Sequence, residues 1–340
     1  MPCEPEGTER SQSLTSQTTY SAESARPMPD KRHRPWPAEA TLAIALAILM
    51  TVLALLRPGF LNFANLVNLL RQISINGILA VGVTYVLLTG GVDLSLGSVV
   101  ALSGVAAASF AHPAQHGVLV PVLAGIFAGA FCGAANGAMV TAGRIAPFIA
   151  TLGMMTAARG ITLLLSGGKP VSNLSVAFSR IGGGSLGSVP APIVIFAAVA
   201  LFSWVFLTNM RTGRYIYAVG GNENAARASG LHVGAIKMTA YILCGALAGL
   251  AGVVLASRIT TGQPNAGIGY ELDAIAAAVI GGASLNGGKG GVGGAVLGAL
   301  LIGVINNGLD LLNVSSYYQQ VVKGLIIVGA VWLDRSRQNA

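Results

Sequence analysis

Seven polar side chains stand singly inside long apolar segments of this sequence: Asp93, Asn136, Arg159, Asn306, Asn307, Asp310 and Lys323. Such groups are expensive to keep in lipid, so they face the protein interior or serve a function. Amides form weak hydrogen bonds and suit a neutral solute rich in hydroxyl groups. Taken singly, each residue fits a structural role better than solute contact, but together they indicate a water-lined interior. We take four of them as candidate pathway or gating residues: Asp93, Asn136, Asn306 and Asn307.

A second polar group lies between two apolar segments, in MRTGRYIYAVGGNENAARASGLHVGAIK, residues 210–237. Within it, NENAARASG predicts a short helix, because Asn222 can cap its start and Glu223 is favourable beside the helix N-terminus. Gly230 can end the helix in the left-handed conformation. A short charged helix between two membrane segments could be a docking element for a partner. The alternative is an ordinary hydrophilic loop that contains a helix by chance.

The sequence contains no recognisable catalytic or metal site. ASLNGGKGG fails as a phosphate-binding loop, because Ala283 replaces the first glycine and Gly290 follows the lysine where Ser or Thr is needed. No His-Glu-x-x-His or Cys-x-x-Cys occurs, and the three cysteines have no metal or disulfide spacing. We therefore expect no enzyme, no bound cofactor and no metal, and any ATP that drives this protein would be hydrolysed by another chain.

The composition predicts an all-α polytopic membrane protein. Of 340 residues, 53% are hydrophobic, only 9% are charged, and 46 are glycine. A bilayer-crossing helix needs about 20 apolar residues. We predict ten spans with broken or re-entrant segments: 38–56, 73–89, 94–111, 118–141, 147–165, 191–208, 238–256, 273–286, 291–312 and 317–333. The third follows the break GGVDLSLGS around Asp93, where irregular backbone must be buried or line a cavity.

The chain divides into a polar tail, residues 1–37, and a membrane domain, residues 38–335. The tail is rich in Ser, Thr, Glu and Pro, which predicts disorder, and it ends in the basic stretch KRHRPWP. Basic residues before the first span indicate a cytoplasmic N-terminus. The same rule places residues 211–237 on the cytoplasmic side.

Two smaller patterns concern packing. Residues 60–72 fit either an amphipathic helix on the membrane surface or an extension of the second span. Glycines recur every four residues in three lines, which predicts close approach of neighbouring helices: Gly125, Gly129, Gly133 and Gly137; Gly245 and Gly249; Gly290, Gly294 and Gly298.

Several long strings resemble the permease subunits of bacterial carbohydrate ABC importers: ILAVGVTYVLLTGGVDLSLGSVVALSG, APFIATLGMM, GRYIYAVGGNENAARASG, GQPNAGIGYELDAIAAAVIGGASLNGGKG and NNGLDLLNVSSYYQQVVKG. The resemblance covers residues 40–335 and implies an inner-membrane importer with ribose as the expected solute. It also implies a cytoplasmic ATPase that uses ATP, a periplasmic sugar-binding protein, and a second permease copy in a homodimer or heterodimer. In this family the segment matching residues 220–230 couples the permease to the ATPase, which assigns that role to Gly220, Gly221, Asn222, Glu223, Ala226, Arg227, Ser229 and Gly230.

Three alternatives stay open at this point. A related ABC permease could carry xylose, galactose, a signalling furanose or a branched-chain amino acid. An ion-coupled sugar carrier would act alone, but would need more ionisable groups at mid-membrane. A membrane enzyme would need a clustered catalytic set.

Overall fold

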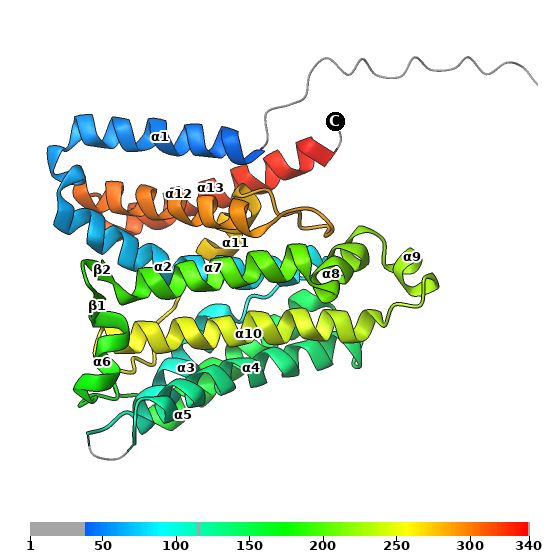
Figure 1. Cartoon of the computed structure of the whole chain (residues 1–340), viewed down its shortest axis with the longest axis horizontal. Coiled ribbons are helices and arrows are strands. Elements are labelled where there is room, and N and C mark those ends of the chain that lie inside the picture. Colours follow the sequence, from blue (N-terminus) through cyan, green and yellow to red (C-terminus); the bar gives the residue numbers. More distant parts are fainter. Residues whose placement is uncertain (1–37, 114–115, 339–340) are drawn as a thin grey trace, which may run out of the picture. The chain divides into compact units, whose positions relative to one another are not determined.

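The computed structural model describes residues 38–113 and 116–338, and most of these residues are helical. The predicted tail, residues 1–37, lies outside the described residues. The helices follow one another in chain order (Figure 1), with a 3-10 turn at Pro58–Leu61: α1 (Ala38–Leu56), α2 (Phe63–Leu88), α3 (Leu96–Phe110), α4 (Leu119–Thr141), α5 (Pro147–Ser166), α6 (Val176–Gly183), α7 (Ala191–Asn209), α8 (Arg211–Gly221), α9 (Glu223–Ala228), α10 (Val233–Arg258), α11 (Tyr270–Ile280), α12 (Val292–Leu311) and α13 (Ser316–Gln338). A two-stranded antiparallel hairpin, β1 (Ser185–Leu186) and β2 (Val189–Pro190), precedes α7.

Seven helices in the described part are long and apolar enough to cross a membrane: α1, α2, α4, α5, α7, α10 and α12. The predicted class, an all-α polytopic membrane protein, is therefore confirmed. The count of ten spans is not, although a helix overlaps each of the ten predicted segments. The other three helices in the predicted segments are α3, α11 and α13. Helix α3 is apolar but has only 15 residues, and α11 has only 11.

The predicted boundaries of the eighth span, 273–286, were wrong. Helix α11 starts at Tyr270 and ends at Ile280, and residues 281–291 form a loop. The loop cannot continue the helix because Gly282, Gly287, Gly288 and Gly290 all have positive φ angles. A left-handed backbone conformation is open to glycine but strained for other residues.

The structure decides between the two interpretations of residues 60–72. After the turn at Pro58–Leu61, one continuous helix runs from Phe63 to Leu88. The Asn62 side chain caps this helix by accepting a hydrogen bond from the Ala64 backbone amide at 3.0 Å. The segment is thus an extension of the second span, and no separate surface helix forms there.

The predicted close packing at the α4 and α10 glycines is confirmed. A Cβ atom placed on Gly129 would lie 2.7 Å from the Gly249 Cα, and one on Gly245 would lie 2.8 Å from the Gly133 Cα. Real Cβ atoms do not approach that closely, so larger residues would push the two helices apart. Helix α10 also packs on α2 and α3, and its central position buries most of its length.

The prediction for the third line of glycines, Gly290, Gly294 and Gly298, is partly wrong. Gly298 faces the backbone of α11 at Ala277, and Gly294 faces the backbone of Gly281 just after that helix, as the spacing predicts. Gly290, however, lies in the loop before α12, with φ at +127°, and does not belong to the helix face. The four-residue spacing extends beyond the helix because this loop is itself rich in glycine.

The two ends of the helix bundle carry different elements. Figure 1 shows α6 and the β1–β2 hairpin at one end, which we call the hairpin end, and α8 and α9 at the other, which we call the α9 end. At the hairpin end, Val171 pairs with Gly262 through backbone hydrogen bonds of 2.9 and 2.8 Å. At the α9 end, the loop 281–291 meets the end of α2, where the Gly288 amide donates to the Leu88 carbonyl at 3.0 Å.

Candidate functional site

Helix α9 has the capped structure that its sequence predicts. The Asn222 side chain accepts a hydrogen bond from the Ala225 amide at 2.9 Å. Gly230 has φ at +82°, and the amides of Gly230 and Leu231 donate to the carbonyls of Arg227 and Ala226 at 3.0 and 3.1 Å. This pair of bonds is the glycine-ended C-cap known as the Schellman motif. Both ends of a six-residue helix are thereby fixed without help from a partner.

Glu223 ties α9 to α10. Its Oε1 atom pairs with Arg227 Nη2 at 3.0 Å, and its Oε2 atom pairs with Lys237 Nζ at 2.6 Å. The hydrogen bond from Lys237 is the main cause that lowers the pKa of Glu223, and the pairing with Arg227 adds to it. Ala226 is buried on the inner side of the helix. A movement of α9 would therefore act directly on the start of α10.

Gly220 joins α8 to two other segments at the α9 end. A Cβ atom on Gly220 would meet the Leu88 carbonyl oxygen and the Gly288 amide nitrogen, so only glycine fits. The Tyr217 hydroxyl donates to the Gly290 carbonyl at 2.9 Å. Helix α8 is thus in backbone contact with the end of α2 and with the loop 281–291. Gly221 has nothing within 4 Å of its own Cβ position, although its backbone lies against Gly288.

Asp93 and Asn136 lie together, between the α2–α3 break and α4. Asp93 is 1% exposed, and its Oδ1 atom accepts from the Ser95 amide at 2.8 Å and the Ser95 hydroxyl at 2.6 Å. The Asn136 amide donates to Ser95 Oγ at 3.0 Å and lies 3.5 Å from both Asp93 oxygens. The Tyr241 hydroxyl reaches the Val92 carbonyl at 3.4 Å. These contacts hold the irregular backbone of the break against α4 and α10.

Asn306 and Asn307 are neighbours in the sequence but face different helices. Asn307 and Asn65 exchange two amide hydrogen bonds of 3.0 Å, which join α12 to α2. Asn306 is 6% exposed, and its Oδ1 atom has no hydrogen-bond partner within the described part of the chain. The four candidate pathway residues therefore occupy three separate places and do not line one cavity.

The partner of Lys323 was not predicted from the sequence. The Lys323 Nζ atom pairs with Asp273 Oδ2 at 2.8 Å, and the Asp273 side chain is only 5% exposed. The pair joins α13 to α11 and lines a cavity of about 10 Å³ next to Asn306. A carboxylate at the start of a predicted span was the available signal, because an isolated charge there needs a partner.

Arg159, also singled out from the sequence, spans from α5 to the loop before α11. Its Nη1 atom donates to the Pro264 carbonyl and, at 3.0 Å, to the Ala266 carbonyl. Arg159 is partly buried and attracts the Glu271 carboxylate. It therefore fixes the loop 259–269 against α5.

Comparisons with known proteins agree on one family. The family model described as "Branched-chain amino acid transport system / permease component" matches residues 65–331. The chain is 47% identical over 308 residues to ribose import permease protein RbsC of Escherichia coli (strain K12), covering 89% of this chain and 95% of the relative. It is 48% identical over 296 residues to RbsC of Bacillus subtilis (strain 168), covering 86% and 92%. D-allose transport system permease protein AlsC of E. coli (strain K12) is 39% identical over 301 residues, covering 88% and 92%. No solved structure matches the chain.

Proposed function

Because the chain belongs to this family of transport-system permease components, we propose that it is the permease subunit of an ATP-driven importer for ribose. The observation that carries the proposal is the higher identity to the ribose permeases than to the allose permease, over almost the same stretch of chain. Its relatives are named as permeases of transport systems, so the chain is a transporter subunit and not an enzyme. ATP is hydrolysed by a separate cytoplasmic ATPase.

In this proposal α8 and α9 form the contact with the ATPase. Three features support that role: α9 is capped at both ends, Glu223 fastens it to Lys237 of α10, and Gly220 packs on Leu88 and Gly288. Closure of the ATPase on ATP binding would move α8 and α9 as one piece. The movement would pass to α10, to the end of α2 and to the loop before α12. Transport follows if these helices have two packings of similar energy.

We further propose ten membrane crossings, with the α9 end in the cytoplasm of a bacterial inner membrane. Helices α3 and α11 would be the two short crossings. The orientation is supported by the basic residues at the α9 end, because such residues favour the cytoplasmic side: Arg144, Arg211, Arg214, Arg227, Lys237 and Lys289. The hairpin end would then face the periplasm and receive a sugar-binding protein.

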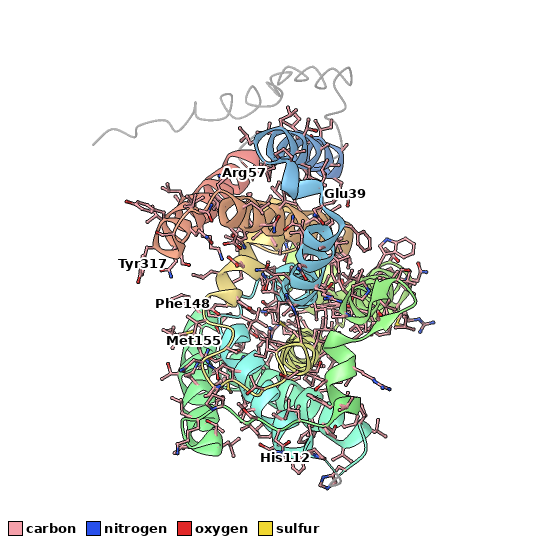
Figure 2. All side chains as sticks on the ribbon, turned by 90° about the vertical axis from the view of Figure 1, so that its left-hand side faces the viewer. Glu39, Arg57, His112, Phe148, Met155 and Tyr317 are labelled. Carbon is pink, nitrogen blue, oxygen red and sulfur yellow. The ribbon has the colours of Figure 1, made fainter. Side chains whose placement is uncertain are left out.

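A second permease copy would complete the pathway. Figure 2, viewed from the hairpin end, has Phe148 and Met155 of α5 on the same side as Tyr317 of α13. Phe148 is 57% exposed and Tyr317 is 82% exposed. An exposed apolar face needs lipid or another protein to cover it. We assign this side to the second copy, which could be identical or related.

The test is uptake of labelled ribose into liposomes that contain the permease and its ATPase, with the binding protein outside and ATP inside. We expect uptake only when all three proteins and ATP are present. Uptake by the permease alone, driven by an ion gradient, would contradict the proposal. Uptake of allose in place of ribose, under the same conditions, would keep the importer and correct the solute.

A further inference from the structure

A groove of about 610 Å³ lies beside α9. Its walls come from the turn between α4 and α5, from α9 and from the first turn and a half of α10. Four charged side chains are among its lining residues: Arg144, Glu223, Arg227 and Lys237. The groove thus shares two of its residues, Glu223 and Arg227, with α9 itself. Any partner that covers α9 would also cover this groove.

The charge of the groove is positive. It contains three permanent cations, Arg144, Arg227 and Lys237, and one carboxylate, Glu223. Both oxygens of Glu223 are already engaged, one by Arg227 and one by Lys237. Two positive charges remain once the carboxylate is subtracted, and an anionic group in the groove would be attracted to them.

Among the three cations of the groove, Arg144 is the one that pairs with no other side chain in the described structure. Its side chain is exposed and has no hydrogen bond or ion pair to any other residue that the structure describes. Its backbone has φ at +53°, a left-handed conformation that is unusual for any residue with a Cβ atom. The turn is fixed on both sides, since the amides of Gly143 and Ile145 donate to the carbonyls of Ala138 and Met139 at 3.0 Å.

Glycine would occupy that turn position without strain. Strained backbone positions concentrate at functional sites, so an observed outlier justifies a functional hypothesis. Within the described structure, the Arg144 side chain makes no hydrogen bond or ion pair that would offset the strain of its backbone. Its guanidinium group does give the groove a planar donor that can pair with a carboxylate through two hydrogen bonds.

We propose that this groove binds a carboxylate-bearing segment of the ATPase, with Arg144 as the main recognition residue. The inference rests on the proposed function, because it assumes that the ATPase docks on α9. It adds a second contact to that site, on the turn between α4 and α5. The ATPase would then hold α4, α5 and α10 together, and α9 would not be its single attachment.

The experiment measures the Kd between the purified ATPase and the full permease in nanodiscs of zwitterionic lipid. Arg144→Gly is the main variant, because glycine keeps the turn and relieves its strain, so folding is preserved. Arg144→Glu adds repulsion. Lys289→Glu is the matched control: it makes the same charge change at the same end, on an exposed residue of the loop 281–291 that lies outside the groove and outside α8 and α9.

We expect Arg144→Gly to raise the Kd about tenfold and Arg144→Glu to raise it further, because charged contacts at an interface act strongly on binding. The salt dependence of the Kd should weaken in both variants, and Lys289→Glu should change it less. An unchanged Kd in both Arg144 variants would overturn the groove contact. So would an equal loss in Lys289→Glu, which would assign the effect to the total charge of this face.

Two other outcomes separate this inference from the proposal on which it rests. If the wild-type permease does not bind the ATPase, the proposed function fails. If the Arg144 variants lose affinity only in nanodiscs with anionic lipid, the groove holds a lipid headgroup and the protein contact is overturned.

Discussion

Gly220 and Gly221 are adjacent in the sequence but have opposite surroundings. The Cβ position of Gly220 is filled by backbone atoms of Leu88 and Gly288, whereas that of Gly221 is open. Backbone atoms cannot move aside as the end of a flexible side chain can. The first glycine is therefore required by packing, and the second is not.

We predict that Gly220→Ala destabilises the protein by about 1–3 kcal/mol, the usual range for overpacking. Gly221→Ala should stay within about 0.5 kcal/mol, as surface substitutions do. Thermal unfolding of the purified proteins measures both changes, and ribose uptake should fall in Gly220→Ala. Equal stability of the two variants would contradict the close contact between α8 and α2.

Glu223 makes the order of α9 depend on pH. Its pKa is lowered from the ordinary value of 4.5, chiefly by the hydrogen bond from Lys237. The ion pairs therefore stabilise α9 fully above pH 4.5, and this stabilisation is lost as the pH falls through the lowered pKa. Because the Glu223 side chain is 41% exposed, the effect should be under about 1 kcal/mol.

Hydrogen exchange of the amides in residues 222–231, compared with Glu223→Gln at each pH, measures this effect. We expect a few-fold faster exchange in the variant at pH 7, and a difference that shrinks as the pH falls through the lowered pKa of Glu223. The comparison removes the intrinsic pH dependence of exchange. The same exchange in both proteins at pH 7 would show that the ion pairs do not order α9.

An ion pair joins helix α13 to α11. Among the helices, its packing in the described structure is mainly on α11, where Lys323 meets Asp273. Asp273 is nearly fully buried, and an unpaired carboxylate in that place would be expensive. The first turn of α11 suits an acidic residue, because the helix dipole is positive there.

We predict that Lys323→Met destabilises the protein by about 3 kcal/mol, because it leaves the Asp273 carboxylate without its partner. Adding Asp273→Asn should recover much of the loss. A double-mutant cycle on thermal unfolding measures the coupling between the two side chains. Additive losses in the double variant would mean that the two side chains do not depend on each other.

The elements could be predicted from the sequence where a physical requirement acts along the chain. Membrane thickness requires long apolar runs, and the glycine spacing of α4 and α10 follows from the helix period. Pairings across the fold could not be predicted in this way. Asp273 and Lys323 are 50 residues apart, and Asn65 and Asn307 are 242 apart. The end of α11 was also missed, because the apolar character of residues 274–280 continues into glycines that leave the helix.

The candidate site shows the same limit. The capped helix 223–228 and the glycine at its end were predictable from local rules. The opposite directions of Asn306 and Asn307 were predictable only in part, since adjacent helical residues diverge by about 100° but the neighbours they meet depend on the fold. The sequence offered Arg144 only as one of the basic residues of the cytoplasmic side, because its further interest comes from a backbone angle and from the groove around it.

At the scale of the whole molecule, the membrane domain and the N-terminal tail should be separable. We predict that removal of residues 1–30 leaves uptake intact, since the basic cluster Lys31, Arg32 and Arg34 stays to set the orientation. Removal of residues 1–36 should lower the amount of correctly inserted protein. Membrane levels and uptake of the two truncated proteins measure this. Loss of uptake at normal levels in the shorter truncation would show that the tail takes part in transport.

The length of α11 has a consequence for how the protein is made. Eleven residues give a helix of about 16 Å, against a hydrocarbon layer of about 30 Å. Such a segment cannot enter a bilayer by itself during synthesis, because the loops on either side would lie in lipid with unpaired backbone groups. It can take its place only once α2, α12 and α13 offer a protein surface to receive it. Biogenesis would thus end with the insertion of α11, after the ribosome has completed the chain around it.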